Sequence, residues 1–223
     1  MPSRTWKDTR RADLLALVSG ALLPLAFAPF EFFPLAVLAP AVLLGLWLDA
    51  PAARAARHGL LFGLGQFGVG GSWIYVAMHG YGNMQAMLAA LVVAVFISYL
   101  ASYQGLLGWT QARFFKDVSE GRRLLLLLPA LWTIADWLRG VVLSGFTWLQ
   151  LGYSQIDAPL SGYAPGLGVY AVTFATVLRA GLLVWLARAP RRRGARALAL
   201  AAALWLGGWL AVRIEWTEPA GDP

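Results

Sequence analysis

The sequence predicts an all-α protein, a polytopic transmembrane helical bundle of about seven spans. Two compositional observations carry this prediction. Of the 223 residues, 59% are hydrophobic and 13% are charged, against roughly 25% charged residues in an ordinary soluble domain. The mean hydropathy is +0.63. A third observation is the pattern, because apolar runs of about the 20 residues needed to cross a bilayer alternate with short basic segments.

The apolar runs are bounded by charged residues or by glycine and proline, which interrupt helices. The seven predicted spans are residues 13–29, 34–49, 57–78, 86–112, 124–143, 166–188 and 196–213. The first two are short and contain Pro24 and Pro40, so they also fit a kinked or partly re-entrant hairpin. In the third, Gly59 and Gly63 form a GxxxG pattern, which is typical of close helix packing.

The distribution of basic residues predicts the orientation, because Lys and Arg in short loops stay on the cytoplasmic side. With the N-terminus in the cytoplasm, every Lys and Arg except Arg139, Arg179 and Arg213 falls in a cytoplasmic segment. The C-terminus is then expected outside the cell membrane, in the periplasm of a two-membrane bacterium. We expect residues 1–213 to form the transmembrane domain and 214–223 to begin a linker.

Composition also excludes several classes of function. The net charge of +7 lies in short clusters between apolar runs, so it describes topology and does not indicate a nucleic-acid partner. The sequence has no cysteine and only two histidines, so we expect no disulfide, no metal site and no cofactor. No serine–histidine–acid triad or paired-carboxylate site can be assembled either, and we expect no catalytic residue in this chain.

The fifth predicted span carries two charged residues near its outer end. Trp132, Asp136 and Arg139 follow one another at i, i+4 and i+7, on one helix face. Two interpretations remain open. In the first, Asp136 and Arg139 form an ion pair that satisfies itself at the interface. In the second, the guanidinium of Arg139 binds the phosphate of an outer-leaflet lipid while Asp136 orients it.

The segment GFTWLQLGYSQIDAPLSGYAPG, residues 145–166, follows on the outer face and has no lysine or arginine. Its aromatic residues are typical of the belt at a membrane surface. Its glycines and prolines prevent a continuous helix, and a non-helical segment at this depth is tolerated where it lines a cavity. We therefore expect Gly145, Trp148, Tyr153 and Gln155 to line a lipid-binding cleft.

A second outer segment, SWIYVAMHGYGNM from Ser72, has the same composition. It contributes Trp73 and Tyr75 to the expected cleft. The two segments together predict walls that open sideways into the outer leaflet. From the residues alone, the sequence thus indicates a membrane module that binds lipids or lipopeptides.

These motifs resemble a known family. GSWIYVAMHGYGNM, PALWTIADWLRG and GFTWLQLGYSQIDAPLSGYAPGLGVYAVTF occur in the order found in the membrane region of bacterial apolipoprotein N-acyltransferases. The resemblance begins at FAPFEFFPLA and continues to IEWTEPAGDP, nearly the whole chain. It implies an inner-membrane enzyme that moves an acyl chain from a phospholipid to the N-terminal amine of a diacylglyceryl-cysteine lipoprotein. The phospholipid donor and the diacylated lipoprotein acceptor are the implied partners.

The resemblance also implies a nitrilase-like domain after the seventh span, in which a cysteine, activated by a glutamate and a lysine, forms a thioester. This chain holds no cysteine and ends at Pro223. We therefore expect it to be a truncated piece that binds and docks substrates without supplying the nucleophile. A small transporter and a non-catalytic membrane scaffold remain the alternatives.

Overall fold

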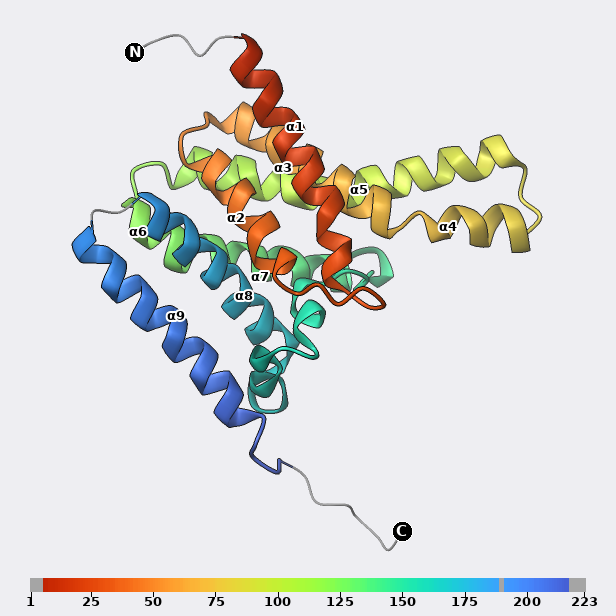
Figure 1. Ribbon diagram of the computed structural model, residues 1–223. Helices are drawn as coiled ribbons and strands as arrows, with labels where there is room; N and C mark the ends of the chain where they lie inside the picture. The colour runs from red at the N-terminus through yellow and green to blue at the C-terminus, as the bar shows by residue number, and fades with distance from the viewer. Residues whose placement is uncertain (1–5, 189–190, 217–223) are drawn as a thin grey trace, which may run out of the picture.

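In the computed structural model, which describes residues 6–188 and 191–216, every regular element of the described residues is helical (Figure 1). This confirms the all-α class. The long helices are α1 (Trp6–Leu22), α2 (Leu35–Leu48), α3 (Ala52–Gly70), α5 (Ala86–Phe114), α7 (Leu128–Val141), α8 (Ala164–Arg188) and α9 (Arg191–Ala211). Short elements complete the fold: η1 (Leu23–Ala26), α4 (Trp73–Val76), η2 (Ala77–Tyr81), α6 (Glu120–Arg122), η3 (Arg123–Leu127), η4 (Val142–Ser144), η5 (Leu151–Gln155) and η6 (Pro159–Tyr163).

Each of the seven predicted ranges contains a helix, but fewer helices meet the requirements of length and hydropathy for a membrane span. Among the described residues, three do so: Ala86–Phe114, Glu120–Ser144 and Pro159–Arg188. The pair Ala52–Gly70 and Trp73–Tyr81, bent by 46°, makes a fourth if it is one span. The count of seven and the membrane orientation therefore stay predictions, and the linker beyond 216 lies outside the described residues.

Helix α1 ends earlier than predicted. The α-helix stops at Leu22 and continues as the 3-10 helix η1, which has Pro24 near its start. Proline lacks the N–H that an α-helical turn requires, which explains the change of helix type. The chain then turns and enters α2, which contains Pro40. The two helices and their turn form a short hairpin.

The connections between helices gather at two ends of the bundle. The α2–α3 and α5–α6 connections lie at the upper left of Figure 1, and the α1–α2 turn and the α7–α8 loop lie toward the lower right. At the first end, Arg188 of α8 binds Asp49 after α2 at 3.0 Å and Glu120 of α6 at 3.2 Å. This arginine therefore joins three segments that are distant in the sequence.

Helix α3 lies at the centre of the fold because its glycines let two neighbours approach closely. A Cβ atom at Gly59 would collide with the backbone carbonyl of Gln104 in α5, and one at Gly65 with that of Leu17 in α1. The close packing predicted from Gly59 and Gly63 is thereby confirmed. Phe62, on the same helix, packs edge-to-face on Trp132 of α7, with ring centroids 5.9 Å apart.

The predicted third span is broken. Helix α3 ends at Gly70, and α4 begins at Trp73 after a turn at Gly71 and Ser72. Helix α4 and the first half of α5 then project together from the bundle, at the right of Figure 1. The bend brings Trp73 next to the α7–α8 loop, where it meets Trp148.

Candidate functional site

The loop between α7 and α8 follows an irregular path at the end of the bundle that also holds the α1–α2 turn (Figure 1). Positive φ angles occur at Leu143 (52°), Ser144 (72°), Gly145 (79°) and Leu149 (58°). At Gly145, φ 79° and ψ 147° belong to a region that is nearly restricted to glycine. A Cβ atom there would also collide with the carbonyl oxygen of Gly140. The sequence therefore needs a glycine at this turn.

Arg139 holds this loop in place. Its side chain is 2% exposed. One terminal nitrogen, Nη1, donates to the backbone carbonyls of Phe146 at 2.6 Å and Trp148 at 2.8 Å. The other, Nη2, lies 3.1 Å from Oδ1 of Asp136. The guanidinium also lies over the ring of Phe67, 5.2 Å from its centroid. The ion pair proposed as one interpretation of these two residues is thus confirmed.

Three further buried side chains bind the backbone of the same loop. Oδ2 of Asp136 accepts the N–H of Leu151 at 3.2 Å. Gln66 of α3 donates to the carbonyl of Leu149 at 3.4 Å. The hydroxyl of Thr173 in α8 accepts the N–H of Gly152 at 2.9 Å. Because this backbone has no helical partners, side chains from three helices supply its hydrogen bonds.

Trp148 is consequently fixed at the surface of the bundle. Its indole N–H donates to the carbonyl of Gly70, at the end of α3, at 2.8 Å. Its ring packs edge-to-face against Trp73, with centroids 5.5 Å apart. The two rings are 50% and 48% exposed, respectively. A tryptophan that is anchored at its polar edge and exposed on its face is well suited to contact an apolar ligand.

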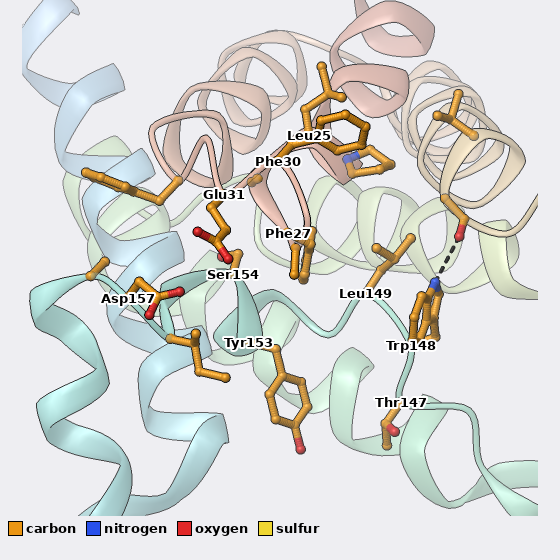
Figure 2. Close-up of a pocket in the computed structure, with 18 residues that line it drawn as sticks. Leu25, Phe27, Phe30, Glu31, Thr147, Trp148, Leu149, Tyr153, Ser154 and Asp157 are labelled. Atoms are coloured by element: carbon orange, nitrogen blue, oxygen red, sulfur yellow. Dashed lines mark hydrogen bonds between the residues drawn. The ribbon is translucent and has the colours of Figure 1, made fainter.

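Two hollows flank Trp148. The larger is a cavity of about 520 Å³ between the α1–α2 turn and residues 147–158 (Figure 2). Phe27, Phe30 and Leu149 contribute apolar wall, and Tyr153 lies at its edge. The smaller hollow is shallow and is lined by Trp73, Gly145, Phe146, Thr147 and Trp148. Both outer segments therefore contribute to the smaller hollow, the second one through Trp73. That this surface is a lipid-binding cleft stays a prediction.

The structure brings together most of the predicted site residues. Trp148 lines both hollows, Trp73 and Gly145 line the small one, and Tyr153 lines the large one. Asp136 and Arg139 lie beneath the loop and do not line either hollow. Their contribution to the site is through the loop backbone.

Two predicted lining residues lie elsewhere. The ring of Tyr75 in α4 packs on His79, with centroids 5.5 Å apart, and Tyr75 does not line either hollow. Gln155 is fully buried, and its Nε2 donates to Oγ of Ser154 at 3.1 Å. Gln155 is the last residue of the 3-10 helix η5 and lies on its buried side with Leu151, Gly152 and Ser154.

Sequence reasoning missed the α1–α2 turn as a wall of the site. This turn supplies Phe27, Phe30 and Glu31 to the large cavity. The signal was present in FAPFEFF, which combines aromatic residues, a proline and one carboxylate, residue types that the 145–166 segment also contains. That the two segments meet depends on the packing of α1, α3 and α7.

The side chains that line this site are of kinds suited to binding a ligand. Its walls are aromatic and aliphatic, with the hydroxyls of Thr147, Tyr153 and Ser154 and the carboxylates of Glu31 and Asp157. Within residues 6–188 and 191–216, no group of three or more His, Cys, Asp or Glu side chains is placed to hold a metal ion. Apolar walls with a few polar groups at the rim fit lipid chains and headgroups.

Comparison with known proteins gives the family. Residues 19–182 match the family model described as the apolipoprotein N-acyltransferase N-terminal domain. An apolipoprotein N-acyltransferase of Methylococcus capsulatus is 46% identical over 96% of this chain and 42% of its own length. The Coxiella burnetii protein of the same name is 38% identical over 94% of the chain and 44% of its own length.

A third relative, the apolipoprotein N-acyltransferase of Vibrio parahaemolyticus, is 46% identical over 78% of the chain and 34% of its own length. The chain thus spans less than half the length of these relatives. The matches cover the site described above, including the α1–α2 turn, α7 and the loop after it. The chain therefore belongs to the apolipoprotein N-acyltransferase family, and it corresponds to the N-terminal membrane part of that family's proteins.

Proposed function

We propose that this chain is the lipid-handling membrane part of an apolipoprotein N-acyltransferase. It admits a phospholipid acyl donor and a diacylated lipoprotein acceptor at the outer face of the bacterial inner membrane. It then presents them to a nitrilase-like domain that carries the nucleophilic cysteine. This chain contributes binding, orientation and docking to the acyl transfer, and the other domain contributes the covalent steps.

One observation carries the proposal: Trp148 stands half-exposed between two hollows on a loop that is bound from below by Arg139. An acyl chain gains free energy by leaving water for an apolar wall, at about 25 cal/mol per Å² of buried apolar surface. The rings of Trp148 and Trp73 offer such a wall, and the anchored indole N–H of Trp148 keeps it in position. A fixed wall orients the chain without a large entropy cost on binding.

We assign Arg139 and Asp136 a positioning role in this function. Both terminal nitrogens of Arg139 already have acceptors inside the protein. These contacts use three of its five N–H donors, and its side chain is 2% exposed, so direct binding of a lipid phosphate, as predicted from the sequence, requires the loop to move and expose the guanidinium. The positioning role and the phosphate role differ in outcome, because only the first predicts that loss of Arg139 disorders the loop.

The test replaces the N-terminal membrane part of the Methylococcus capsulatus relative with this chain and measures acyl transfer from a labelled phospholipid to a lipoprotein substrate. We expect an active chimera, and Trp148→Ala is expected to lower its rate by about ten-fold, the loss typical of a central aromatic contact. Trp137→Ala is the matched control, because Trp137 is 49% exposed on α7 and lines neither hollow. Equal rates for the two variants contradict the proposal.

A further inference from the structure

The large cavity contains two carboxylates that the proposed function does not use. Glu31 comes from the α1–α2 turn, and Asp157 comes from the segment between η5 and η6. Figure 2 shows both on the same side of the cavity, with Phe27 and Leu149 between them and Trp148. Within the described part of the chain, neither side chain makes a hydrogen bond or an ion pair. Their charges are therefore available to a ligand.

The other residues that line the cavity make it selective for positively charged groups. The described lining residues include no lysine, arginine or histidine. Glu31 and Asp157 are both exposed to solvent at this cavity, so water screens their field, and the selectivity comes from the sign of the two charges together. The cavity thus favours a cation and disfavours an anionic headgroup. Phe27, Phe30 and Tyr153 add aromatic faces, which also attract cations.

The backbone around Glu31 fixes the direction in which its side chain leaves the main chain. Glu31 has φ 55°, a left-handed conformation that residues other than glycine and asparagine adopt at a cost. Its N–H donates to the carbonyl of Phe27 at 3.0 Å, and its carbonyl accepts from Phe33 at 2.7 Å. The turn is therefore closed on both sides of the residue, and it presents the carboxylate at the cavity.

We propose that this cavity binds the primary ammonium group of an amphiphile, with Glu31 and Asp157 accepting its N–H hydrogens. An ammonium offers three donors, enough for both carboxylates and one further acceptor. The apolar wall covers the portion of the amphiphile next to the amine. The inference rests on the proposed function in one respect, that the ligands are lipids or lipopeptides. Ethanolamine phospholipids and the free N-terminal amine of a diacylglyceryl-cysteine peptide share this chemistry.

The test measures lipid binding to the 223-residue chain by native mass spectrometry in detergent. The probes are dioleoyl phosphatidylethanolamine, dioleoyl phosphatidylcholine and a diacylglyceryl-cysteine peptide with a free or an acetylated amine. The two phospholipids have the same acyl chains and differ in their N–H donors. We expect at least one primary amine to bind about ten-fold more tightly than its N-blocked counterpart.

The variants assign this preference to the two carboxylates. Glu31→Gln and Asp157→Asn keep the side-chain shape and are each expected to reduce the preference by about three- to five-fold, as for partly exposed ion pairs. The matched control is Asp117→Asn, which removes one charge from an exposed residue that does not line the cavity. Unchanged binding of phosphatidylcholine shows that each variant is folded.

The outcomes separate the two sources of the amine and the two proposals. A preference for phosphatidylethanolamine alone identifies the phospholipid as the ligand, and a preference for the free-amine peptide alone identifies the lipopeptide. Equal binding of amines and blocked amines, or no change in Glu31→Gln and Asp157→Asn, overturns the inference and leaves lipid binding intact. Failure of every probe to bind, together with an inactive chimera, overturns the proposed function as well.

Discussion

Replacement of Arg139 by methionine tests most directly how the loop after α7 is held. Methionine keeps much of the apolar volume of the arginine stem but removes all of its donors. The change leaves the carbonyls of Phe146 and Trp148 without their present donor. It also leaves the carboxylate of Asp136 buried without its cation, 4% exposed in the folded protein.

The magnitude follows from these contacts. Removal of one partner of a buried ion pair costs about 3–5 kcal/mol. Each carbonyl that loses its donor adds about 1 kcal/mol, the low end of the usual range, because water reaches this exposed loop. Together these contributions amount to about 5–7 kcal/mol, and relaxation of the loop reduces the expected loss in the free energy of opening to about 4 kcal/mol. This is a large part of the stability of a domain of this size.

Amide hydrogen exchange measures this opening locally. Leu151 N–H, which donates to Asp136, and Gly152 N–H, which donates to Thr173, report on the loop. A loss of about 4 kcal/mol accelerates their exchange on the order of a thousand-fold. Arg179→Met is the control, because Arg179 also lies within a predicted span and its Nη1 has no hydrogen-bond partner.

Unchanged exchange at Leu151 and Gly152 in Arg139→Met contradicts the role of Arg139 in holding the loop. That role is contradicted equally by the same acceleration in Arg179→Met, because the effect then comes from the loss of any arginine in the bundle. In Arg139→Met/Asp136→Leu, the unpaired charge is gone, so exchange is expected to slow again relative to Arg139→Met. Recovery remains partial because Leu151 and the two loop carbonyls still lack their partners.

Three other substitutions test the backbone and the apolar wall. Gly145→Ala is expected to lower the free energy of unfolding in detergent by at least about 2 kcal/mol, because φ is 79° there and the new Cβ atom would collide with the carbonyl of Gly140. Gly45→Ala is the control, and it is expected to be neutral or stabilising because the space around Gly45 is open. Gly59→Ala is expected to force α3 and α5 apart and to lower the unfolding temperature, while Gly68→Ala, with nothing within 4 Å, leaves it unchanged. Trp148→Phe loses the hydrogen bond to α3, worth about 1 kcal/mol, but keeps an aromatic ring, so acyl transfer by the chimera is expected to fall less than in the alanine variant. A larger loss in the phenylalanine variant contradicts the apolar role.

The sequence predicts the helices because their hydropathy is a local property. Residues 86–112 and 166–188 lie within α5 and α8 almost to the residue. The break after Gly70 was not predicted, although Gly70 and Gly71 stand at it. Ala52–Gly70 and Trp73–Tyr81 are together apolar enough to be one span, so hydropathy does not mark the 46° bend between them.

Residues of the candidate site could be predicted as partners from the sequence where they lie on the same helix. Asp136 and Arg139 share a helix face, so their ion pair follows from a spacing of three residues. Their main-chain acceptors, in contrast, depend on where the loop passes after α7. No local pattern in the sequence specifies that path, and a lipid phosphate was an equally reasonable acceptor for Arg139.

The two carboxylates of the large cavity could not be predicted from the sequence as parts of one site. Glu31 and Asp157 lie far apart in the sequence, and each alone is an ordinary polar residue in a turn. They meet because α3 holds the α1–α2 hairpin on one face and α5 on another, which places the hairpin turn against the loop after α7. A single sequence carries no direct signal of such a meeting.

The acceptors of Arg139 have an evolutionary consequence. Carbonyl oxygens of the main chain are present in every amino acid, so any residue at positions 146 and 148 leaves this anchorage intact. This anchorage therefore places no demand of its own on the side chains there, and Trp148 is constrained by its contacts with Gly70 and Trp73 instead. Selection can reshape what the surface recognises while inheritance preserves the route of the polypeptide beneath it.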